Sequence, residues 1–178
     1  MHTKISPIKI IYTHYNSYIN CNTKKIRWQD HMIFSCMPIL SIILCFILQV
    51  KMQPVVISNF IIFTVMISAI SFILMLYIAN VAIDFLKTMP KKGVKTSSYA
   101  IYLEELSANA GYTFIMSLLT IFCFIMASTN TNIILNIFSA FSIGLFIHII
   151  LILFMMIKRI FAFTVQHLNY ARTGEKIT

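Results

Sequence analysis

Charged residues are scarce in this sequence. Only 11% of its 178 residues are Asp, Glu, Lys or Arg, and 59% are hydrophobic, whereas an ordinary soluble domain is about 25% charged. Residues 133–157 contain no charged residue at all, and this stretch exceeds the roughly 20 apolar residues that a helix needs to cross a bilayer core of about 30 Å. The composition excludes an ordinary soluble domain and predicts an integral membrane protein.

Acidic residues are the scarcest charged type. The sequence has five of them, all outside the apolar cores of the long hydrophobic runs: Asp30, Asp84, Glu104, Glu105 and Glu175. Intramembrane carboxylates, which proton relays and transporters commonly use, are therefore not expected. The HExxH and GxSxG motifs are missing, and the four Cys and five His show no metal-ligand spacing. We expect no enzyme activity, no cofactor and no metal site.

The first 31 residues are basic and rich in tyrosine. Their apolar and aromatic residues have helical spacing, at Ile8, Ile11, Tyr12, Tyr15, Tyr18 and Ile19. This pattern predicts a helix lying in the plane of the membrane surface, with His14 off the apolar face; a disordered basic tail is the alternative. No cleavable signal peptide is expected, because the first long apolar run begins only near residue 32. Trp28 suits an interfacial anchor just before that run.

Four apolar runs predict four membrane-spanning helices, at residues 32–50, 55–79, 110–128 and 133–157. The short link at 51–54 predicts that the first two spans form an antiparallel hairpin. Helical periodicity continues beyond the membrane to Lys87 and ends at Met89-Pro90 and Gly93. A separate helix is predicted in the loop 88–108 after Thr96-Ser97-Ser98, and the last helix continues past Lys158 as an amphipathic stem. We therefore predict an all-α polytopic membrane protein with three parts: a segment 1–31, a four-helix bundle 32–158 and a stem and tail 159–178.

The 14 Lys and Arg residues predict the orientation of this bundle. With four spans, all of them except Lys51 fall on one side of the membrane, in the N-terminal segment, the loop 88–108 and the C-terminal tail. By the positive-inside rule, that side is cytoplasmic. The prediction is a multi-pass protein of a bacterial inner membrane with both termini in the cytoplasm.

Small and polar residues recur along the predicted spans. In the last span, Asn136, Ala140, Gly144 and His148 recur every fourth position and should face protein rather than lipid. Similar stripes run through Thr64, Ser68 and Ser71, and through Asn109, Thr113, Ser117 and Thr120. Such stripes either pack helices closely or line a water-filled path. His148 is either a proton-sensitive or pore-lining group, or a neutral histidine hydrogen-bonded to a Ser or Thr of a neighbouring helix.

The cytoplasmic ends of the predicted helices carry charges of both signs: Lys87, Lys91, Lys92, Lys95, Glu104, Glu105, Lys158 and Arg159. These residues predict a surface that binds a soluble cytosolic protein; a topology signal beside a solvated helix face is the simpler alternative. The same extensions carry apolar residues that a second copy of the chain or a partner would bury. These residues are Val81, Phe85, Phe161, Val165 and Leu168.

Two segments carry a resemblance to a known family. With the four-span layout and its long inner helices, YLEELSANAGYTFIMSLL (Tyr102–Leu119) and HIILILFMMIKRIFAF (His148–Phe163) resemble the KwaA family, the membrane subunit of the Kiwa anti-phage defence system. The resemblance implies a non-enzymatic homo-oligomer, a tetramer, that senses infection at the envelope. It also implies a soluble DNA-binding partner on the cytosolic face, so that contact with nucleic acid would be indirect. No residue roles are carried over.

Two other functional classes fit the same composition. One is a bacteriocin-immunity or plasmid entry-exclusion protein, which would act within the bilayer and would not need its cytosolic extensions. The other is a pore-forming effector, in which the stripe containing His148 would line a channel. The neighbouring genes would separate the three hypotheses.

Overall fold

The computed structural model describes residues 7–16, 28–88, 96–129 and 133–173. These residues form five helices and no strand: α1 (Pro7–Asn16), α2 (Trp28–Ile47), α3 (Pro54–Thr88), α4 (Thr96–Thr129) and α5 (Ile133–Thr173). The prediction of an all-α fold is confirmed for this part of the chain.

Three of the helices are long and apolar enough to cross a membrane. The candidate segments are Pro54–Ile83 of α3, Tyr102–Ser128 of α4 and Ile134–Phe161 of α5. The apolar part of α2, Met32–Ile47, is shorter. The structure thus supports a membrane protein with three potential spans, each close to a span predicted from the sequence.

The long helices continue beyond these apolar segments, as the periodicity predicts. α3 has 35 residues and α5 has 41, which correspond to about 52 Å and 60 Å at 1.5 Å per residue. α4 runs without a break from Thr96 through Gly111, so the helix of the loop 88–108 and the third predicted span are one element. We call the end that carries Lys158 and Arg159 the basic end; the opposite end carries Lys51.

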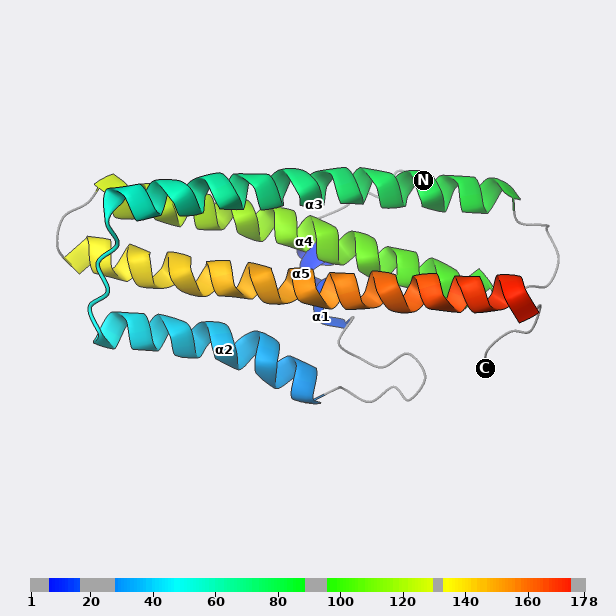
Figure 1. The fold of residues 1–178 in the computed structure, drawn as a ribbon, viewed down its shortest axis with the longest axis horizontal. Helices are drawn as coiled ribbons and strands as arrows, with labels where there is room; N and C mark the ends of the chain where they lie inside the picture. The colour runs from blue at the N-terminus through cyan, green and yellow to red at the C-terminus, as the bar shows by residue number, and fades with distance from the viewer. Residues whose placement is uncertain (1–6, 17–27, 89–95, 130–132, 174–178) are drawn as a thin grey trace.

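The helices pack along their lengths, with α3 on α4, α4 on α5 and α2 on α5 (Figure 1). α2 covers only the first half of α5 and runs antiparallel to it. The predicted hairpin is therefore corrected: α2 and α3 are antiparallel, but the main packing partner of α2 is α5. The link between α2 and α3 passes across the bundle in Figure 1 to allow this arrangement.

The polar stripes of α3 and α4 are buried in this packing. Thr64 and Ser71 of α3, and Thr113, Ser117 and Thr120 of α4, are almost completely inaccessible. The hydroxyls of Thr64, Thr113, Ser117 and Thr120 donate to carbonyls one turn earlier in their own helices, at 2.7–2.8 Å. Their small side chains are therefore satisfied locally while neighbouring helices pack closely, which favours the packing interpretation of these stripes.

α1 is helical, as predicted, but its protein contact is on an unexpected face. The apolar residues Ile8 and Tyr12 are 76% and 66% exposed, whereas His14 is fully buried against α4. The sequence pattern placed His14 off the apolar face. The physical reason is that α1 has two different faces. Ile10 and His14 on one face pack against protein, whereas the apolar side chains of the other face are exposed.

α2 ends in a turn that normally selects glycine. Gln49 has φ 49°, its N–H donates to the carbonyl of Phe46 at 3.2 Å, and the N–H of Val50 donates to the carbonyl of Cys45 at 3.0 Å. This pair of bonds is the Schellman motif, in which the left-handed residue is usually Gly because a Cβ is unfavourable there.

Gln49→Gly should therefore stabilise the protein, by about 0.5–1 kcal/mol after the extra entropy of the unfolded chain is included. The measurement is the midpoint of thermal unfolding in one detergent. Gln49→Ala is the matched control, since it keeps the Cβ and should gain nothing. A glycine variant that melts at or below the wild type would contradict the prediction.

Candidate functional site

His148 of α5 lies between α2 and α4. Its Nδ1 is 3.1 Å from the backbone oxygen of Phe34 in α2, and its Nε2 is 3.1 Å from the hydroxyl oxygen of Tyr112 in α4. A carbonyl oxygen only accepts, so Nδ1–H is the donor to Phe34. Nε2 of the neutral ring then accepts the hydroxyl proton of Tyr112. The two contacts together fix one neutral tautomer of His148.

Pro38 removes the usual helical donor to the carbonyl of Phe34. In an α-helix the carbonyl of residue 34 would accept the N–H of residue 38, but proline has no N–H. Loss of a hydrogen bond to a buried carbonyl costs about 1–3 kcal/mol. His148 supplies the missing donor from α5. The backbone carbonyl of Phe34 in α2 and the imidazole of His148 therefore satisfy each other's hydrogen-bonding needs.

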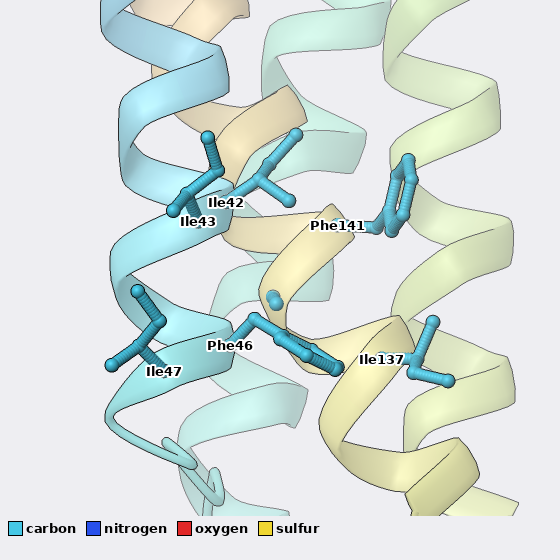
Figure 2. Close-up of a pocket in the computed structure, with 7 residues that line it drawn as sticks. Ile42, Ile43, Phe46, Ile47, Ile137 and Phe141 are labelled. Carbon is cyan, nitrogen blue, oxygen red and sulfur yellow. The ribbon is translucent and has the colours of Figure 1, made fainter.

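The small residues of the α5 stripe allow α2 to approach closely. A Cβ on Gly144 would overlap the side chain of Ile42 and lie 3.0 Å from the backbone oxygen of Pro38. Ala140 is buried and borders an apolar crevice of about 250 Å³ between α2 and α5. Figure 2 shows this crevice, with Ile42 of α2 on the side of Phe141 of α5, and Phe46 of α2 beside Ile137 of α5. Ala140, Gly144 and His148 therefore form the track on which α2 packs.

Asn136, the fourth member of the predicted stripe, is half-buried. Its buried Oδ1 has no hydrogen-bond partner among the described residues. The stripe was predicted to face protein, and three of its four members contact or border α2. The crevice beside Ala140 is lined by apolar side chains, and the role of the stripe as a pore lining stays a prediction.

Gly144→Ala should separate α2 from α5, because the added methyl has no room beside Ile42 and Pro38. Overpacking of this kind costs about 1–3 kcal/mol. Gly111→Ala is the matched control: its Cβ would lie 3.4 Å from Ile10 and 3.6 Å from Met75, which is close to ordinary contact. Thermal unfolding in detergent should drop clearly for the first variant and little for the second. Equal effects would contradict the proposed close approach.

His14 of α1 forms the second half of the same site. Its Nδ1 donates to Oδ1 of Asn109 in α4 at 2.6 Å. Its ring stacks on that of Tyr112, with centroids 3.9 Å apart and planes 8° apart. We call His14, Asn109, Tyr112 and His148 the histidine–tyrosine cluster. Because Tyr112 contacts both histidines, the cluster connects α1, α4, α5 and, through the carbonyl of Phe34, α2.

Burial is the main cause of an altered pKa at His14. Desolvation lowers the pKa from 6.5 to about 4, and the hydrogen bond with Asn109 opposes this shift. Coulombic repulsion from Arg159, and from His148 when that ring is protonated, adds to the lowering. At neutral pH the imidazole of His14 is therefore uncharged. The two neutral histidines contact opposite parts of one tyrosine, His14 by stacking and His148 by a hydrogen bond, and donors match acceptors in the three hydrogen bonds of this cluster.

Sequence reasoning found part of this cluster. His148 was singled out, but the expected Ser or Thr partner is wrong: its partners are a tyrosine and a backbone carbonyl. Asn109 was recognised only as a member of a polar stripe. His14 and Tyr112 were missed. The available signals were Pro38, which leaves a carbonyl needing a donor, and a histidine placed opposite the apolar face of α1.

The charges of the basic end have different environments. Arg159 of α5 donates to the carboxylate of Glu105 in α4 at 3.1 Å, and both side chains are largely buried. Glu104 and Lys158 are exposed. Lys91, Lys92 and Lys95 lie outside the described residues. Trp28 begins α2 and Lys87 lies in the last turn of α3, and their predicted roles as anchor and docking residue stay predictions.

The bond from His148 to Phe34 generates a test by double substitution. His148→Leu leaves the carbonyl of Phe34 and the hydroxyl of Tyr112 without this partner, which should cost about 1–3 kcal/mol of stability. Adding Pro38→Ala supplies an N–H to the same carbonyl within α2 and should recover part of the loss.

The measurement is a double-substitution cycle of thermal stability in one detergent. Pro54→Ala combined with His148→Leu is the control, since Pro54 is the first residue of α3 and frees no carbonyl near His148. Additive effects of Pro38→Ala and His148→Leu would show that the two residues do not satisfy one another.

In comparisons with known proteins, no family model, curated protein or solved structure matches this chain.

Proposed function

We propose that this chain is a non-enzymatic, homo-oligomeric inner-membrane protein that binds a soluble cytosolic partner at its basic end. The proposed setting is an anti-phage defence system in which the protein senses infection at the envelope. The partner would be the DNA-binding component, and the oligomer a tetramer. Both of these features, and the setting itself, come from the resemblance of Tyr102–Leu119 and His148–Phe163 to the KwaA family.

The membrane arrangement behind this proposal has α2 as a fourth span beside the three long helices. α2 has 20 residues, about 30 Å of helix, and it packs along α5 over its length in Figure 1. With four spans, the distribution of Lys and Arg places the basic end in the cytoplasm. Exposed apolar side chains along α2 and α3 then face lipid or other copies of the chain.

The observation that carries the proposal is the extension of α5 beyond its apolar segment. α5 continues for 12 residues after Phe161, about 18 Å of helix. On and near this extension Phe161 is 70% exposed, Val165 is 39% exposed, and Lys158 is exposed. Glu104 is exposed on the neighbouring helix α4. Apolar and charged groups side by side on a projecting helix suit a protein-binding surface.

Co-purification with the soluble protein encoded beside this gene tests the proposal. We expect the wild type in mild detergent to retain that protein stoichiometrically. Phe161→Ser combined with Glu104→Lys should reduce retention about tenfold or more, as loss of an interface anchor does. Glu104→Lys adds positive charge at the basic end and so does not weaken the signal that sets the orientation.

The matched control combines Leu48→Ser with Lys51→Glu at the opposite end. Leu48 is 70% exposed, as Phe161 is, so the control removes a comparable apolar side chain and changes one charge. It should retain the partner. A homo-oligomer that binds no soluble protein would contradict the proposal and favour an immunity, exclusion or pore-forming role. Equal losses in both variants would show that the basic end is not the interface.

A further inference from the structure

α1 is attached to the rest of the protein by a small contact. It packs on α4, mainly through Ile10 and His14, while Ile8, Ile11, Tyr12 and Tyr15 remain exposed to different extents. A helix of ten residues has little stability of its own. The position of α1 therefore depends on the few groups that it buries, and His14 is the largest polar one among them.

The surroundings of His14 suit a neutral ring and oppose a charged one. From α4 it meets the amide of Asn109 and the ring of Tyr112, and Tyr15 of its own helix lies edge-on to it. From α5, the charge of Arg159 acts against protonation of His14, and His148 adds to this effect when its own ring is protonated. Glu105, one turn of α4 before Asn109, is engaged by Arg159.

We propose that α1 is an acid-released latch: neutral His14 holds it on α4, and uptake of a proton by His14 releases it. Release would free the stacked face of Tyr112, whose hydroxyl also donates to His148. The step would therefore change one side of the connection between α4, α5 and α2. This mechanism does not depend on the function proposed above or on the orientation in the membrane.

The direction of the pH dependence follows from linkage. The docked state takes up its proton on His14 near pH 4, and an undocked α1 near pH 6.5. Between these values the undocked state binds more protons, so docking weakens as the pH falls. Docking is fully favoured above pH 6.5. The ratio of docked to undocked α1 should fall about tenfold per pH unit below it, by roughly 160-fold at pH 4 and toward a limit of about 300-fold at still lower pH.

Double electron–electron resonance measures the release directly. Nitroxides would be placed at Tyr12→Cys, which is exposed on α1, and at Leu48→Cys, which is exposed at the opposite end. The background would be a full-length chain in detergent with its native cysteines replaced by serine. We expect one narrow distance distribution at pH 8 and a broad, shifted one at pH 4.5. A distribution that stays unchanged across this range would overturn the proposal.

Three substitutions identify the group that takes up the proton. His148→Gln should keep the acid-dependent change, whereas His14→Gln should abolish it; the reverse pattern would assign the effect to His148 and overturn the proposal. If α1 does not dock at any pH in His14→Gln, the Asn109→Asp variant still tests the proposal. It places a carboxylate beside Nδ1 of His14, so docking should persist at pH 5, where the wild type releases. Release of this variant at the wild-type pH would also overturn the proposal.

Discussion

The hydrogen bond from His148 to the backbone of Phe34 determines how α2 joins the other helices. α2 contains Pro38, which cannot donate the helical N–H to the carbonyl of Phe34, and a donor from another helix replaces it. α5 provides that donor at 3.1 Å and, one turn away, the absence of a side chain at Gly144, where the backbone of Pro38 comes close. This polar contact and the close approach at Gly144 explain why α2 packs on α5 although the chain connects it directly to α3.

The same bond has consequences on the other side of the imidazole. Because Nδ1 donates to Phe34, Nε2 has to accept, and Tyr112 supplies the proton at 3.1 Å. The ring of Tyr112 is thereby held in the position where His14 stacks on it. Pro38 thus determines the bond that His148 makes, His148 positions Tyr112, and Tyr112 provides the ring on which α1 packs. A change in α2 would therefore alter the packing of the N-terminal helix through His148 and Tyr112.

The sequence was sufficient for features that depend on neighbouring residues along the chain. Long uncharged runs predict α3, α4 and α5, and continued periodicity predicts that these helices outrun their apolar segments. The stripe from Ala140 to His148 was predicted to face protein. The partners could not be predicted, because the residues in contact are 114 positions apart for Phe34 and His148 and 95 apart for His14 and Asn109. Helical periodicity gives the face of a helix, but it does not say which neighbour that face meets.

The two histidines show how position gives one residue type two different roles. Both nitrogens of His148 are engaged by groups from two long helices, so the ring is held on both sides and closes a gap in the hydrogen bonding of α2. His14 is carried by a helix of only ten residues, and a positive charge on it would be opposed by burial and by the nearby charges of α5. Loss of neutrality at His148 would disturb the core of the bundle. Protonation of His14 would chiefly release α1. Moving this peripheral helix alone costs less free energy than disturbing the packing of the long helices, so α1 is the better-suited element for a response to pH.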